Sequence, residues 1–210
     1  MRDGGSEAGL LARTGPVPDE TRTKGPRLPT FSPAAAAELP GPDWLRRRRT
    51  AAAEAFAAAP LPTEKEEVWR YSRIDELDLD RYQPAGPERP GSPAGQVPDP
   101  ARAVADALGP RSALVVTVGG SVAVLDGPEE DGLSVGRAAD TPGSEELVGR
   151  VAGSPPDLQL LNDAFAPDPV VVDVRPGAVV ADPVVLVHLV GRAEGEASFP
   201  RTVVRSGAGS

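Results

Sequence analysis

Few residues of this 210-residue chain have the types and spacing that active sites use. The chain contains no cysteine, so it has no thiolate nucleophile, no disulfide and no cysteine ligand for zinc or an iron–sulfur cluster. Its single histidine, His188, lies in the run 184–190, where alternation places it on one strand face with Val184, Leu186 and Val190. A lone histidine in such a strand is more typical of a hydrogen-bonded structural residue than of a base or a metal ligand.

No nucleophile or phosphate-binding motif accompanies His188. The patterns G-x-S-x-G, G-x-G-x-x-G and G-x-x-x-x-G-K-[ST] are all absent from the sequence. Carboxylates are plentiful, but their spacing brings no two of them to a defined catalytic separation. The densest basic run, Arg46 to Arg49, covers the whole circumference of a helix. We therefore interpret this run as a solvated helix surface whose aliphatic stems cover apolar neighbours.

The net charge is acidic and unevenly distributed. Lysine and arginine number 22 and aspartate and glutamate 31, a formal net charge of −9. Residues 1–50 carry a net charge of +3 and the remainder −12, and this acidic balance argues against a nucleic-acid-binding protein. No secretory signal is visible, and no apolar run approaches the roughly 18 residues of a membrane-spanning helix. We therefore expect a soluble, cytoplasmic protein.

The first half of the chain divides into three parts. Residues 1–41 are rich in glycine, proline and charge and are expected to form a disordered or loosely docked tail. Residues 42–82 predict a helical region, with one helix from Asp43 to about residue 59 and a short second helix after the capping box Thr63–Glu66. Residues 83–100 hold many prolines and glycines and are expected to be a linker.

The second half predicts a mixed region over 101–165 and a strand-rich region over 166–210. The first contains a helix over 101–108, a hairpin around Gly119-Gly120, a strand over 133–135 and helices over 145–151 and 157–165. The second contains short valine-rich strands with sharp corners, a pattern that fits a meander, a barrel or the first coils of a β-solenoid. Because its last strand, 202–205, leaves an uncapped edge, we expect the chain to be a piece of something longer.

Two segments resemble the SufB/SufD family of iron–sulfur cluster assembly proteins. The stretch 61–72, L-P-T-E-K-E-E-V-W-R-Y-S, is similar to the N-terminal signature of the SufD branch, with serine where threonine is usual. The stretch 160–165, followed by valine-rich strands and then by 199–201, is similar to the start of the family core. The residues that carry the match are Glu67, Trp69, Arg70, Tyr71, Asn162, Phe165, Pro200 and Arg201.

The resemblance implies a fold and a function. The fold would be a mixed α/β piece, in which a helical N-terminal region precedes the first coils of a right-handed parallel β-helix. The function would be that of a non-catalytic scaffold subunit that acts with SufB and the ATPase SufC, through contact regions expected beyond residue 210. No catalytic, metal or cofactor residue transfers to this chain, since the iron–sulfur clusters and ATP belong to the parent complex and its partners. The absence of cysteine fits SufD better than SufB, the subunit expected to supply one.

The matched residues are interpreted as structural. Trp69 and Tyr71 are expected to anchor the N-terminal region on the core, because aromatic residues are scarce in this chain. Two other functions stay open. One is a standalone module whose acidic surface binds a basic partner. The other is a β-solenoid carbohydrate-active enzyme, which would need paired carboxylates that residues 170–205 do not show in a regular array.

Overall fold

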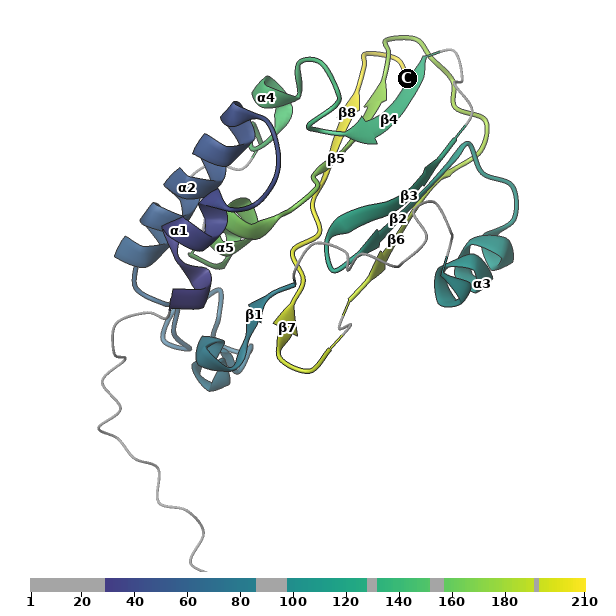
Figure 1. The fold of residues 1–210 in the computed structure, drawn as a ribbon. Helices are drawn as coiled ribbons and strands as arrows, with labels where there is room; N and C mark the ends of the chain where they lie inside the picture. The colour runs from purple at the N-terminus through teal and green to yellow at the C-terminus, as the bar shows by residue number, and fades with distance from the viewer. Residues whose placement is uncertain (1–28, 86–97, 128–131, 152–156, 191–192) are drawn as a thin grey trace, which may run out of the picture.

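Two three-stranded sheets face each other in the computed structural model (Figure 1), which describes residues 29–85, 98–127, 132–151, 157–190 and 193–210. The first sheet has the order β3-β2-β6 and is built from β2 (Ala113–Val118), β3 (Ser121–Asp126) and β6 (Val184–Leu189). The second has the order β4-β5-β8 and is built from β4 (Leu133–Arg137), β5 (Val170–Val174) and β8 (Thr202–Ser206). A two-residue parallel pair joins β1 (Gln83–Pro84) to β7 (Glu196–Ala197).

The hairpin of β2 and β3 confirms the sequence prediction. Gly119 and Gly120 form its turn with φ values of +62° and +96°, which residues with a side chain rarely adopt. The register shifts between Val116 and Thr117, so Val124 faces one side of the sheet and Val122 the other. This shift lets β3 contribute apolar side chains to both faces.

The expectation of a right-handed parallel β-helix is wrong. Strands β2 and β6 pair in parallel, as do β5 and β8, but β2 with β3 and β4 with β5 are antiparallel pairs. The described strands therefore form three small sheets of mixed direction, not the all-parallel coils of a solenoid. The tight glycine turn reverses the chain after β2, and a helix, α5 (Asp157–Phe165), precedes β5. These two local features interrupt the repeated strand–corner pattern that a solenoid requires.

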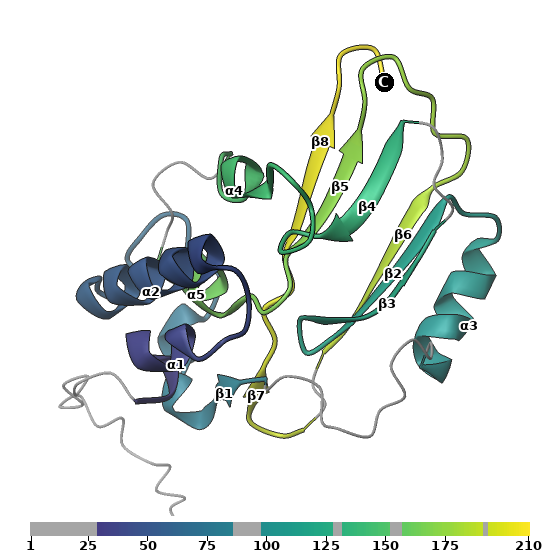
Figure 2. The ribbon, with the colours of Figure 1, turned by 45° about the horizontal axis from the view of Figure 1, so that its top comes forward.

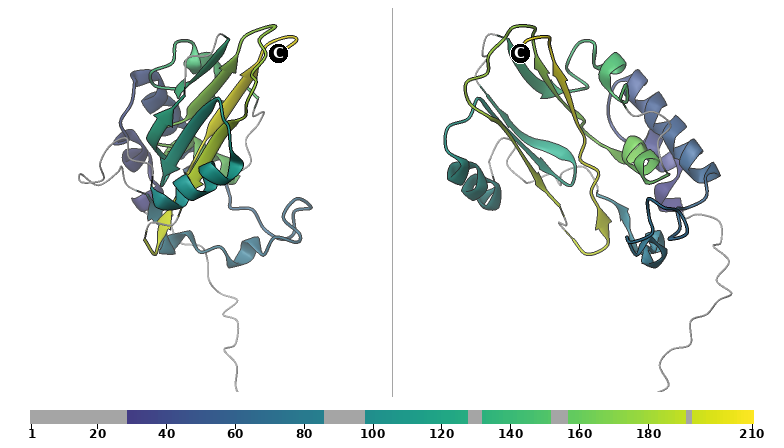
Figure 3. Two further views of the ribbon diagram at one scale, coloured as in Figure 1. Left: turned by 90° about the vertical axis from the view of Figure 1, so that its right-hand side faces the viewer. Right: turned by 180° about the vertical axis from the view of Figure 1, so that it is seen from behind.

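One hydrophobic core lies between the two sheets. Val115 and Val122 from the first sheet meet Leu133, Val170 and Val172 from the second. Helix α3 (Asp99–Leu108), predicted from the sequence, covers the outer face of the first sheet through Ala101 and Ala105. Figure 3 shows α3 and the N-terminal helices on opposite outer sides of the paired sheets. Side chains of the first sheet therefore point either to the core between the two sheets or to the outer face that α3 covers.

The remaining helices gather at one end and on the outer side of the second sheet (Figure 2). The 3-10 turn η1 (Pro29–Phe31) and helix α1 (Pro33–Ala37) pack with the predicted helix α2 (Asp43–Ala58) and with α5. Helix α4 (Ser144–Leu147) lies over Val171 and Val203 of the second sheet. Residues 29–41 had been expected to belong to the tail. Instead Ser32 caps α1, and Phe31 and Ala36 are buried, while residues 1–28 lie outside the described part.

The short helix expected after the capping box does not form. Residues 63–73 follow a series of turns, then the 3-10 turns η2 (Ile74–Glu76) and η3 (Leu79–Arg81) lead into β1. Half of the capping box is present, since the Thr63 amide donates to Glu66 Oε1 at 3.0 Å. Of the expected linker 83–100, residues 86–97 lie outside the described part.

Candidate functional site

The matched residues of the second segment meet where α5 lies against the chain between β7 and β8. The Asn162 side-chain amide donates to the Pro200 carbonyl at 3.0 Å. Arg201 Nη1 lies 3.5 Å from Asn162 Oδ1 and forms a long hydrogen bond. Asn162 therefore contacts two residues that lie 38 and 39 positions later in the sequence. We name this contact region the α5–β8 junction (Asn162, Asp163, Pro200 and Arg201).

Asp163 binds two arginines at this junction. Its carboxylate forms an ion pair with Arg201 and a second one with Arg48 of α2, where Arg48 Nη2 lies 3.7 Å from Oδ2. The Asp163 side chain is 7 % exposed and that of Arg201 13 % exposed. Burial lowers the pKa of Arg201, and the nearby Arg48 charge acts in the same direction. The cluster therefore joins α2, α5 and the C-terminal strands through one buried carboxylate.

Arg49 is fully buried beside this cluster, so the interpretation of the whole run 46–49 as a solvated surface is wrong for this residue. Its guanidinium donates to the carbonyls of Ala166 at 3.1 Å and Pro40 at 2.7 Å. The guanidinium also donates to the carbonyls of Leu39 and Pro167. Desolvation lowers the pKa of Arg49 to about 10 against an opposing effect of Asp168, so the group stays charged at neutral pH.

Phe165 belongs to an aromatic cluster below the junction. Its ring centroid lies 5.3 Å from that of Phe31 and 5.9 Å from that of Phe199. Phe31 and Phe165 are buried, and Phe199 packs against the same apolar core. This arrangement fits the structural interpretation of Phe165, since an edge-to-face contact such as that with Phe31 stabilises a core beyond area burial alone.

The four matched residues of the first segment lie on the surface loop 63–76. Glu67 and Arg70 form an exposed ion pair with 3.2 Å between Oε2 and Nη1. Trp69 is half-buried, whereas Tyr71 is 91 % exposed. The expectation that Tyr71 anchors the N-terminal region on the core is therefore wrong.

His188 pairs with Thr117 across the parallel strands β6 and β2. Its Nδ1 lies 2.8 Å from the Thr117 hydroxyl, and Thr117 is buried. Desolvation lowers the pKa of His188 below its ordinary 6.5, so the ring is neutral at pH 7. A neutral ring held by a hydroxyl joins two strands by a hydrogen bond.

Metal chemistry and membrane spanning find no support in the described ranges. No three histidine, aspartate or glutamate side chains there come together in a way that could hold a metal ion. No helix in this part of the chain is both long and apolar enough to cross a membrane.

Sequence reasoning missed Arg48, Arg49 and Asp163. A signal for Arg49 exists, because the apolar stripe of α2 runs from Leu45 to Ala52 with a gap of seven residues, and Arg49 fills the missing turn. Asp163 adjoins the matched Asn162, but nothing in its spacing indicates which arginines it would meet.

The chain was also compared with known proteins. No protein-family model matches it, and no curated protein matches it either.

Proposed function

We propose that this chain is a SufD-like, non-catalytic scaffold subunit of a cytoplasmic SUF iron–sulfur cluster assembly complex, acting with SufB-like and SufC-like subunits. The β-helix expected from the resemblance forms no part of this proposal. The clusters are cargo of the complex, and ATP belongs to the SufC-like subunit.

The observation that carries the proposal is the pairing of the matched residues in the α5–β8 junction. Asn162, Pro200 and Arg201 come from separate stretches of the signature and contact one another. Such contacts are what the structural interpretation of these residues predicts. A scaffold role also fits the chemistry of the junction, since the Asp163 carboxylate forms ion pairs with Arg201 and Arg48.

The test tags the gene at its chromosomal locus, so that the protein is purified as the cell makes it. We expect SufB-like and SufC-like proteins to co-purify in near-stoichiometric amounts. Deletion of the gene is expected to lower the activity of iron–sulfur enzymes several-fold and to leave cluster-free enzymes unchanged. Purification without either partner, together with unchanged iron–sulfur enzyme activity in the deletion strain, would overturn the proposal.

A further inference from the structure

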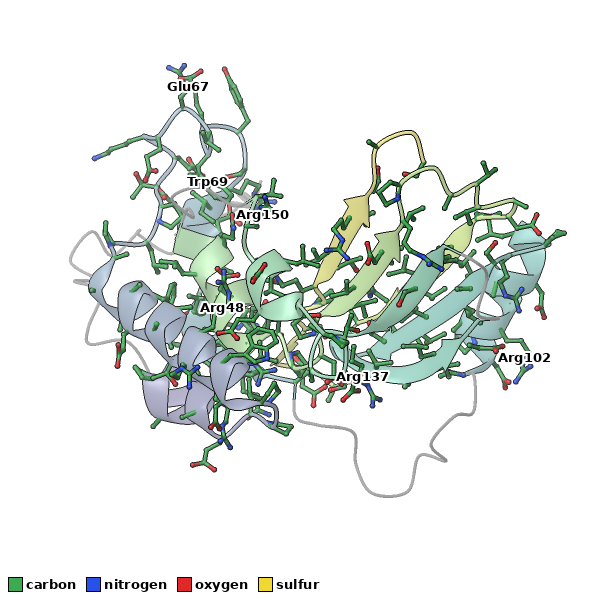
Figure 4. The ribbon with its side chains drawn as sticks, turned by 90° about the horizontal axis from the view of Figure 1, so that it is seen from above. Arg48, Glu67, Trp69, Arg102, Arg137 and Arg150 are labelled. Carbon is green, nitrogen blue, oxygen red and sulfur yellow. The ribbon has the colours of Figure 1, made fainter. Side chains whose placement is uncertain are left out.

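The loop 63–76 carries large apolar side chains on its outside. Val68 is 85 % exposed and Tyr71 91 % exposed, while Trp69 between them is half-buried. In Figure 4, Glu67 lies at the outer end of this loop and Trp69 lies nearer to the helices. Full burial of a side chain such as valine would stabilise the fold by removing apolar surface from water. Val68 and Tyr71 are not buried and lack this stabilisation, which is typical of side chains in a contact surface.

The loop holds its shape through its own polar groups. The Glu64 amide donates to Asp75 Oδ1 at 3.1 Å and so joins the two ends of the loop. Successive turns are closed by the amides of Glu66, Trp69 and Ser72, which donate to carbonyls three residues earlier. A loop ordered before binding loses little conformational entropy on binding, and Val68 and Tyr71 are therefore presented as fixed anchors.

The charge of the loop indicates the chemistry of what it binds. Residues 63–76 contain five acidic and three basic side chains, a net charge of −2. Two of the three basic groups bind glutamates of the loop itself, since Arg70 pairs with Glu67 and Arg73 pairs with Glu76 at 2.6 Å. The loop therefore presents two apolar anchors within a negatively charged rim.

We propose that the loop 63–76 is a docking surface for a protein partner with an apolar pocket bordered by lysine and arginine side chains. Val68 and Tyr71 enter the pocket, and the acidic rim faces the basic border. A second copy of this chain is a poor occupant, because its net charge of −9 opposes the charge of the loop. The inference goes beyond the proposed function, since its chemistry does not require the partner to be a SUF subunit.

The test places the photo-crosslinking residue p-benzoylphenylalanine at position 71 of the full chain in its own organism. The crosslinked protein is identified by mass spectrometry and purified, and its affinity for the unmodified chain is measured by calorimetry. The double substitution Val68→Ser and Tyr71→Ser is expected to weaken binding at least tenfold. Val179→Ser, a matched control at a valine that is 86 % exposed on the β5–β6 connection, is expected to leave binding unchanged. Raising the salt concentration is expected to weaken binding of the wild type.

Four results would each overturn the inference. They are the absence of a crosslinked product above that of the same probe at position 179, a crosslink only to a second copy, an affinity unchanged in the double variant, and an affinity independent of salt. Circular dichroism and the thermal midpoint establish that the double variant is folded, as expected for two exposed positions. A partner outside the SUF system would support this inference and leave the proposed function to its own test.

Discussion

At the residue scale, buried charges hold the N-terminal helices to the body of the protein. The buried guanidinium of Arg49 donates hydrogen bonds to four backbone carbonyls in place of water. The Asp163 carboxylate neutralises part of the charge of Arg48 and Arg201. A buried charge is strongly destabilising once its partner is removed, because the desolvation penalty then lacks compensation. These side chains therefore connect separate elements of the fold.

The substitution Asp163→Asn tests the importance of the buried carboxylate. It leaves two guanidinium groups close together without their shared anion, and we expect the free energy of unfolding to fall by about 3–5 kcal/mol. Urea titration followed by circular dichroism measures this change. Asp173→Asn is the matched control, because the partner of Asp173, Arg205, lies at the surface. The control should lose much less stability, and an equal loss in both variants would contradict the role given to Asp163.

The desolvation of His188 predicts a dependence of stability on pH. Burial lowers the pKa of His188 below 6.5, so the unfolded chain binds a proton at a higher pH than the folded chain does. The contribution of this group to stability is therefore present above pH 6.5 and is lost as the pH falls through the interval below it. His188→Gln should remove that part of the pH dependence. Urea titrations at pH 7.5 and 5.5 measure the difference, and parallel losses in both proteins would refute the prediction.

At the element scale, local signals determine most helices and the hairpin. The helix α2 begins at Asp43 after a proline and ends before Pro60, and the predicted α3 lies over Asp99–Leu108. The two strands of the hairpin flank Gly119 and Gly120, as predicted. The loop 63–76 departs from its predicted helix, since the amides of Glu66, Trp69 and Ser72 donate to carbonyls three residues earlier and form successive turns.

Gly120→Ala tests how tightly the hairpin turn packs on the rest of the fold. The residue has φ +96°, and an added Cβ would lie 3.0 Å from Pro167 Cδ and 3.1 Å from the Phe199 carbonyl oxygen. We expect a loss of about 2–3 kcal/mol in the free energy of unfolding, from backbone strain and crowding together. Gly177→Ala is the control, with φ +73° and open space around it, and should lose about 1 kcal/mol from strain alone. Equal losses would show that the turn has room for a side chain.

At the scale of the whole molecule, each three-stranded sheet ends in a strand that was added in parallel. In the described part of the chain, β6 pairs only with β2, and β8 only with β5. Such edges present unpaired backbone groups that favour association with another chain. Val204 of β8 is 65 % exposed, although its register partner Val172 is buried in the core.

Val204→Lys tests this edge. A lysine there must stay hydrated, so we expect self-association to be reduced relative to the wild type. Sedimentation velocity at protein concentrations up to about 100 μM measures the effect. Val179→Lys, a charge added at an exposed position outside the strands, should leave association unchanged. A wild-type protein that remains monomeric over this range would contradict the prediction.

Local sequence signals predict most of the strands and helices, because helix caps, prolines, paired glycines and side-chain periodicity act within a few residues. It also restricted the chemistry, since a chain without cysteine and with one histidine offers few catalytic groups. Strand direction and the partners of buried charges, in contrast, depend on contacts between distant segments. Valine-rich strands with sharp corners have the same local pattern in a solenoid and in paired sheets, and direction depends on contacts such as that between β5 and β8. The burial of Arg49 also depends on distant contacts, because its guanidinium donates to a backbone carbonyl more than 100 positions away in the sequence in place of water.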